Sequence, residues 1–228
     1  MGYKTHVMIL IPSNGMIVAD TVKSLTIMFG NACMKPFPGC SSVEEQKVSI
    51  MIAESSLLSA NREKMVHKAL RSDATHVLFL DSDMTFPMNT IHTLLKYDVD
   101  FVAANCTTRA EPILPVAHDL EGRRLPSKGK KGLEEVQHVG LAVALIKTSA
   151  IKKIKSPPLF LIDWIPELFS YCGEDVYFCQ KLRQVGVPIM IDHDISREIG
   201  HVGKRVCKHS MIDYDAPEMD WLKDNGDL

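Results

Sequence analysis

The stretch THVLFLDSD, residues 75–83, decides the fold class. Its first six residues form a nearly continuous apolar run, which is typical of a parallel strand that is buried on both faces. The run stops at Asp81-Ser82-Asp83, and Pro87 predicts the start of a helix over residues 88–97. Ligands of open α/β sheets bind beyond the carboxyl ends of the strands, so this position is a candidate binding site.

Outward from this strand, short apolar runs alternate with amphipathic stretches of helix length, a pattern typical of a mainly parallel sheet flanked by helices. The predicted strands are residues 6–11, 99–104, 139–146, 159–162 and 188–191, and the other predicted helices are 17–29, 59–72, 149–154 and 173–185. Residues 30–42 and 121–132 are predicted loops, the second a candidate lid, and the tail from 204 onward is expected to be irregular. We therefore expect a single α/β domain over residues 1–228.

The composition is that of an ordinary globular protein, with 228 residues, 46% of them hydrophobic, and a formal net charge of −2. This charge excludes a globally basic, histone-like nucleic-acid binder. The six cysteines form no Cys-x-x-Cys pair, which favours reduced thiols over a disulfide scaffold or zinc site. The apolar run over residues 7–11 is too short for a signal peptide or a membrane span. We expect a cytoplasmic protein without stable membrane insertion, and the oligomeric state stays open.

Asp81 and Asp83 are the first candidate functional residues. At positions i and i+2 of an extended segment, both carboxylates project to the same side. They repel each other unless a cation lies between them and a bound phosphate, so the pair predicts a divalent-cation site. The Asp-x-Asp pattern occurs at 81/83, 98/100, 192/194 and 213/215. Of the other copies, one precedes its strand and one lies in the tail, so only Asp192/Asp194 competes.

Two further candidates lie in the second half of the chain. Glu174 and Asp175 follow Gly173 at a predicted helix start. Acidic residues there either complement the helix dipole or supply a general base toward an acceptor hydroxyl. His201, in the segment GHVG, is either a turn residue at the surface or a ligand of a metal such as Mn²⁺.

Together, and in this order, these segments resemble the GT-A glycosyltransferases, particularly the short bacterial and phage members related to family 2. The segments that carry the resemblance are PSNG (12–15), Asn61-Arg62, THVLFLDSDMTFP (75–87), VGLAVALIKTSAIKKI (139–154), GEDVYFCQKLRQVGVPIMID (173–192) and GHVG (200–203). The resemblance implies a Rossmann-like, mainly parallel central sheet flanked by helices in one GT-A domain. Its nucleotide-binding part would span about residues 1–105, its acceptor-side part about 106–203, and its tail 204–228.

The resemblance also implies the reaction, which is metal-dependent transfer of a sugar from a nucleotide-diphosphate sugar, with UDP favoured, to an acceptor hydroxyl. Asp83 would ligate Mn²⁺ or Mg²⁺, Asp81 would contact the ribose or reach the metal through water, and His201 would be the third ligand. Asp175, or less favourably Glu174, would be the base of an inverting enzyme. The residues that would hold the nucleotide are Pro12, Ser13, Asn61, Arg62, Asp81 and Ser82.

The acceptor could be a saccharide, a protein or a modified DNA base, the last in the host cytoplasm if the protein is of phage origin. Basic residues at 123, 124, 128, 130 and 131, and at 204, 205 and 208, either contact a phosphate backbone or are solvated. A nucleotidyltransferase would require a lysine-containing phosphate loop where this chain has PSNG. A non-catalytic sugar-binding module would not require Asp83, Asp175 and His201 around one cleft.

Overall fold

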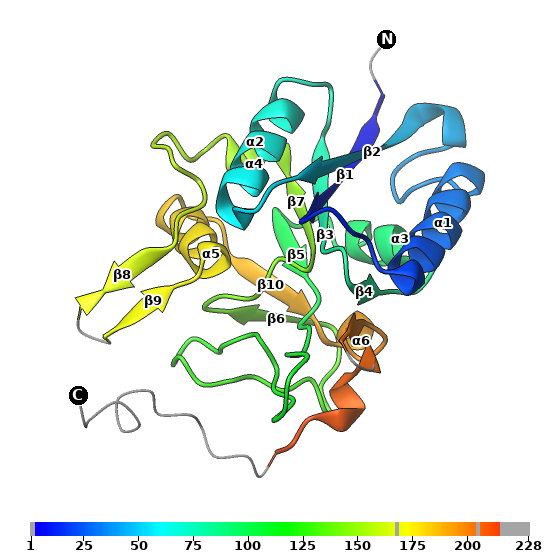
Figure 1. Ribbon diagram of the computed structural model, residues 1–228. Helices are drawn as coiled ribbons and strands as arrows, with labels where there is room; N and C mark the ends of the chain where they lie inside the picture. The colour runs from blue at the N-terminus through cyan, green and yellow to red at the C-terminus, as the bar shows by residue number, and fades with distance from the viewer. Residues whose placement is uncertain (1–2, 167–168, 204–205, 215–228) are drawn as a thin grey trace.

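A computed structural model describes residues 3–166, 169–203 and 206–214 of the chain, and its centre is a seven-stranded sheet in the order β2-β1-β3-β7-β5-β10-β6 (Figure 1). The strands are β1 Thr5–Ser13, β2 Gln46–Glu54, β3 His76–Leu80, β5 Phe101–Ala103, β6 Leu133–Val136, β7 Val143–Lys147 and β10 Ile189–Asp192. Strand β1 is parallel to β2 and β3, and β10 is parallel to β5, whereas β7 and β6 are antiparallel to their neighbours. The predicted α/β fold with a mainly parallel sheet in a single domain is confirmed.

Helices cover both faces of this sheet. They are α1 Ala19–Met34, α2 Leu58–Leu70, α3 Thr90–Leu95, α4 Thr148–Ile151, α5 Glu174–Gln184 and α6 His193–Ser196. Side chains alternate along β1, so that Met8 and Leu10 pack in a core with α2, α4 and α5, whereas Val7 and Ile9 pack in a second core with α1, α3 and α6. Figure 1 shows the two groups of helices on opposite sides of the strands.

Two smaller sheets complete the fold. Strands β4 Met84–Thr85, β11 Gly200–Val202 and β12 Val206–Cys207 form an antiparallel sheet in the order β12-β11-β4. Strands β8 Asp163–Ile165 and β9 Ser170–Cys172 form a hairpin that projects from the body beside α5 (Figure 1). Short 3₁₀ turns lie at Val43–Glu45 and His209–Met211.

Several predicted boundaries are wrong. Helix α1 continues to Met34, five residues beyond its predicted end, because Ala32 is still buried in the core and the buried Asn31 amide donates to the Met88 carbonyl at 3.1 Å. The first part of the predicted loop 30–42 is therefore helical. The predicted strand 159–162 is not formed, and strand pairing begins only at Asp163. Leu159 and Phe160 are apolar because they fill the core, where the ring of Phe160 stacks on Phe178 at 4.6 Å.

Strands β2 and β6 were not predicted, and both lie at edges of the sheet. Eight of the nine residues of β2 are partly or fully exposed, so it lacks the continuous apolar run that marks a buried strand. The tail expected to be irregular from residue 204 contains β12 and the turn His209–Met211, and its part from residue 215 lies outside the described residues.

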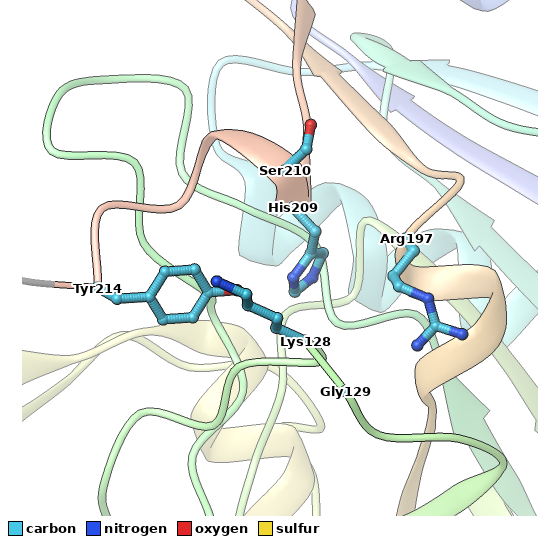
Figure 2. Close-up of a pocket in the computed structure, with 6 residues that line it drawn as sticks. All are labelled: Lys128, Gly129, Arg197, His209, Ser210 and Tyr214. Atoms are coloured by element: carbon cyan, nitrogen blue, oxygen red, sulfur yellow. The ribbon is translucent and has the colours of Figure 1, made fainter.

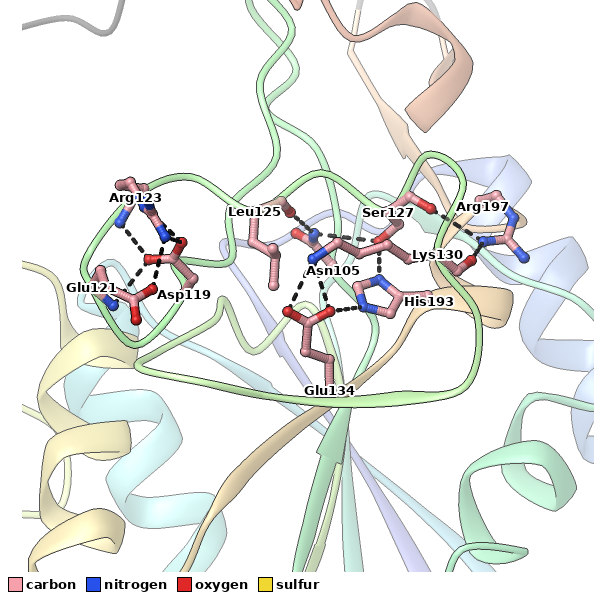
Figure 3. A network of polar contacts seen from close by, with 10 residues as sticks. All are labelled: Asn105, Asp119, Glu121, Arg123, Leu125, Ser127, Lys130, Glu134, His193 and Arg197. Carbon is pink, nitrogen blue, oxygen red and sulfur yellow. Dashed lines mark hydrogen bonds and ion pairs between the residues drawn. The ribbon is translucent and has the colours of Figure 1, made fainter.

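The predicted loop 121–132 contains no helix or strand, but polar contacts hold it on the body (Figure 3). Arg123 pairs with Asp119 at 2.9 Å and with Glu121 at 2.8 Å. At the other end, Arg197 donates to the carbonyls of Ser127 at 3.2 Å and Lys130 at 2.6 Å. These contacts restrain both ends of the loop, and a lid function stays a prediction.

No disulfide joins any of the six cysteines, all of which lie in the described ranges. Within the described ranges, every helix is too short or too polar to cross a bilayer.

Candidate active site

A cleft of about 500 Å³ opens at the carboxyl ends of β1, β2 and β3. Its lining consists of Pro12, Ser13, Asn14, Met16, Val18, Ser55, Ser56, Leu58, Asp81, Ser82, Asp83, Arg109 and His201. The structure thus brings together Pro12, Ser13, the segment 81–83 and His201, as the sequence predicts. The predicted site residues outside this lining are Asn61, Arg62, Glu174 and Asp175.

The turn after β1 is preformed by its own hydrogen bonds. The Ser13 hydroxyl donates to the carbonyl of Met16 at 2.8 Å and accepts from the Gly15 amide at 3.0 Å. Gly15 has φ of 112°, which favours glycine. The Val18 amide donates to the Ser82 carbonyl at 2.9 Å. This wall of the cleft is therefore fixed directly against the segment that carries both aspartates.

Asp83 and His201 meet at the floor of the cleft, where Asp83 Oδ2 and His201 Nε2 are 3.3 Å apart. Pairing of β4 with β11 sets His201 opposite Met84, and the Val202 amide donates to the Asp83 carbonyl at 2.7 Å. His201 Nδ1 donates to the Thr107 carbonyl at 2.7 Å. Because a carbonyl only accepts, Nδ1 carries a proton, so a hydrogen bond from Nε2 to Asp83 requires the imidazolium form. The neutral ring would instead offer its Nε2 lone pair to a cation beside Asp83.

Arg109 is the third charged group at this position, and its Nη1 lies 2.5 Å from Asp83 Oδ2. Burial favours a raised pKa for Asp83, but the hydrogen bond from His201 and the charges of His201 and Arg109 outweigh it and hold this pKa below the usual value. Burial also opposes protonation of His201, yet its contact with Asp83 raises the His201 pKa. Sequence reasoning missed Arg109, although its place shortly after the predicted strand 99–104 puts it at the carboxyl edge of the sheet.

Arg62 is buried beneath the cleft, with 2% of its side chain exposed. Its Nη2 binds Asp81 Oδ1 at 2.7 Å, and its Nη1 binds Glu174 Oε1 at 2.6 Å. The guanidinium thereby joins the end of β3 to the start of α5, and it lies 5.8 Å from the ring of Phe79. Asn61 donates to the Ala53 carbonyl at 2.7 Å and fixes α2 to β2. Both side chains position other elements in this structure.

Glu174 and Asp175, the first two residues of α5, lie in the electric field of the buried Arg62 guanidinium. Burial raises the pKa of both carboxyls, and the positive charge of Arg62 opposes this rise. The Val176 amide donates to Asp175 Oδ1 at 2.8 Å. Gly173 leaves room for this carboxylate, because a Cβ there would lie 2.9 Å from Asp175 Oδ1. A carboxylate with a raised pKa at the start of a helix has the properties of a general base.

The described residues contain no group of three or more histidine, cysteine or acidic side chains arranged to hold a metal ion. Asp81 is turned toward Arg62 and stands apart from Asp83 and His201, and its predicted contact with the ribose, or with the metal through water, stays a prediction. The Asp83 carboxylate and the His201 imidazole, in contrast, lie next to each other and could bind the same ion. This pair fits Mn²⁺ or Mg²⁺ if diphosphate oxygens and water complete the coordination.

The fold is shared with the crystal structure of A197 from STIV. The two chains align with a TM-score of 0.58 at 18% identity, over 91% of this chain and 92% of A197. Two crystal structures of S. aureus TarS align with TM-scores of 0.44, at 17% and 18% identity over 83% and 82% of this chain and 58% and 35% of TarS. No family model and no curated protein sequence matches the chain. The comparison with A197 shows a shared GT-A-like fold.

Proposed function

We propose that the protein is a glycosyltransferase that transfers a sugar from a nucleotide-diphosphate sugar to an acceptor hydroxyl with the help of a divalent cation. The observation that carries this proposal is the meeting of Asp83 and His201, 118 positions apart in the sequence, at 3.3 Å on the floor of a cleft. The cleft lies where the carboxyl ends of three parallel strands meet, which is the position of ligands in open α/β sheets.

Each wall of the cleft has a role in donor binding. The turn at residues 12–16 and the serines at 55 and 56 offer polar groups to the nucleotide. Asp83 and His201 would hold Mn²⁺ or Mg²⁺, which when bound neutralises charge on the leaving diphosphate. Arg109, with 60% of its side chain exposed, can turn from Asp83 to a diphosphate oxygen. A UDP-sugar remains the favoured donor on the basis of the GT-A resemblance.

The acceptor would be deprotonated by Asp175, with Glu174 held by Arg62 as its neighbour. Hairpin β8–β9 leads directly into α5, and its rings at Trp164, Phe169 and Tyr171 are 40%, 69% and 69% exposed. The Trp164 ring contacts the rings of Phe169 and Tyr171 at centroid distances of 5.1 and 5.0 Å, and the three form an aromatic surface on the hairpin that directly precedes the acidic pair in the chain. Uncharged rings suit the apolar faces of a saccharide, so we favour a saccharide as acceptor over a protein.

A DNA-base acceptor is less well supported, because ion pairs neutralise two of the five basic residues in the loop 121–132, here called the basic loop. Arg123 pairs with Asp119 and Glu121, and Lys130 pairs with Glu134 at 2.9 Å. If DNA is nevertheless the acceptor, transfer will fall steeply between about 50 and 200 mM salt, because cations are released from the phosphates on binding. A flat salt response would count against DNA.

The decisive experiment measures donor hydrolysis and transfer for a panel of UDP-, GDP- and other nucleotide sugars with Mn²⁺, with Mg²⁺ and with a chelator. We expect turnover with at least one donor and loss of turnover in chelator. Absence of metal-dependent turnover with every donor would overturn the proposal. Titration of the free nucleoside diphosphates by calorimetry shows separately whether the cleft binds the donor's leaving group.

A further inference from the structure

A second pocket, of about 390 Å³, lies in the C-terminal half of the fold. Its lining residues are Lys128, Gly129, Arg197, His209, Ser210 and Tyr214, none of which lines the candidate active site (Figure 2). Two of these side chains are cationic and none is acidic. Asp194 compensates the charge of Arg197, whereas Lys128 has no carboxylate partner among the described residues, so the pocket carries the uncompensated positive charge of Lys128.

His209 is the buried member of this lining, with 4% of the residue exposed. Its Nε2 donates to the carbonyl of Asn105, whereas its Nδ1 has no hydrogen-bond partner among the described residues. Figure 2 shows the imidazole pointing into the space between Lys128 and Arg197. Since Nε2 carries the proton, Nδ1 of the neutral ring is an acceptor that calls for a hydroxyl or N–H donor. Leaving such a buried atom unpaired costs stability.

The two cations differ in how they are held. Arg197 is fixed by its ion pair with Asp194 at 2.5 Å and by two carbonyls of the loop. Lys128 is exposed, its Nζ lies 4.7 Å from the centre of the Tyr214 ring, and it has no carboxylate partner within the described ranges. Its neighbours in the basic loop, Arg123 and Lys130, are ion-paired. Lys128 is thus a cation that remains available to a ligand.

We propose that this pocket binds a small phosphate ester that also carries free hydroxyls, such as a polyol or sugar phosphate. The phosphate lies at Lys128 and Arg197, and a ligand hydroxyl donates to His209 Nδ1. A fully ionised phosphate offers only acceptor oxygens, so it satisfies the cations but not Nδ1. The proposed glycosyltransferase activity is not required for this inference.

Binding is measured by calorimetry on the full chain, in chelator so that no cation draws phosphate into the active-site cleft. The probes are glycerol 3-phosphate, methyl phosphate and glycerol. We expect glycerol 3-phosphate to bind about fivefold more tightly than methyl phosphate, as one added hydrogen bond predicts, and glycerol not to bind. Lys128→Gln should raise the Kd at least fivefold, whereas Lys131→Gln, at an exposed lysine of the same loop outside the pocket, should leave it within twofold.

A second readout follows His209 itself, through the ¹⁵N shift of Nδ1 in histidine-labelled protein. This shift should move on addition of glycerol 3-phosphate and stay unchanged with glycerol. The proposal would be overturned by absence of binding, by equal effects of the two lysine substitutions, or by equal affinities for methyl phosphate and glycerol 3-phosphate. Circular dichroism of Lys128→Gln and Lys131→Gln verifies that each variant is folded.

Discussion

Replacing Arg62 by methionine tests whether this buried guanidinium holds the candidate site together. The substitution keeps an unbranched side chain of similar length but removes the charge that Asp81 and Glu174 share. Removing one partner of a buried ion pair costs about 3–5 kcal/mol. Because Asp81 keeps 28% and Glu174 13% of the side chain exposed, water compensates part of this loss, and we expect about 3 kcal/mol at pH 7.5.

The pH dependence gives a sharper test than the magnitude. Burial raises the pKa of Glu174 and Asp175, and Arg62 opposes the rise, so both pKa values should rise further in the variant. A folded state with raised carboxyl pKa values binds protons more tightly than the unfolded chain. Its free energy of unfolding therefore falls as the pH rises through the folded pKa, and the deficit of the variant should narrow between pH 7.5 and pH 5.

Urea unfolding at the two pH values measures both effects. The matched control is Arg71→Met at the exposed end of the same helix, which should change the free energy of unfolding by no more than about 0.5 kcal/mol. The free energy of unfolding of Arg62→Lys should lie between those of the wild type and Arg62→Met, because one ammonium group does not reproduce the contacts of the guanidinium with two carboxylates. A deficit below about 1 kcal/mol, or the same deficit at both pH values, would refute the charge argument.

Asp83→Asn should abolish metal-dependent donor turnover in a hydrolysis assay. The control is Asp98→Asn, in another Asp-x-Asp copy, which should retain turnover because asparagine tolerates the φ of 50° found at residue 98. Equal losses of turnover in the two variants would remove the basis for the cation site. Asp175→Asn should leave the Kd for the nucleoside diphosphate within about twofold and lower transfer at least about 100-fold, and an unchanged transfer rate would exclude Asp175 as the base. Burial lowers the pKa of His76 to about 4, so its NMR resonance should stay that of the neutral ring at pH 6. In the unfolded chain His76 becomes protonated below pH about 6.5, so the free energy of unfolding should fall as the pH is lowered from about 6.5 toward 4. His76→Gln should make this loss of stability smaller.

The sequence predicts the parts of the fold whose signal is local. The buried strand at residues 76–80 and the helix that begins after Gly173 are recognisable from a run of apolar residues or from the residues at one end. Edge strand β2 is not recognisable in this way, because only its first residue is buried and its side chains from Ser49 onward alternate between partly and fully exposed. The segment 159–162 has the apolar run that predicts a strand, but Leu159 and Phe160 are apolar because they pack in the core, and the segment pairs with no described strand.

The same distinction applies to the candidate site. Asp81 and Asp83 follow a recognisable strand, but their different partners do not follow from their two-residue spacing. Asp81 turns to Arg62, which comes from α2, and Asp83 turns to His201 and Arg109. The partners come from segments at sequence separations of 19 and more residues, so only the folded chain determines which carboxylate faces Arg62 and which faces His201.

The arrangement of His201 shows how much of the site depends on two very short strands. Strand β4 has two residues and β11 has three, and alone such a pair contributes little stability. Their register nevertheless fixes His201 beside Asp83, and Gly200 is required there because a Cβ would lie 2.4 Å from the Thr85 hydroxyl. The second hydrogen bond of His201, to Thr107, ties the imidazole to the segment after β5 that also carries Arg109. Three segments thus determine one imidazole orientation, and because the strands are too short to hold it by pairing alone, the contacts of the segment 105–109 must supply the remaining rigidity.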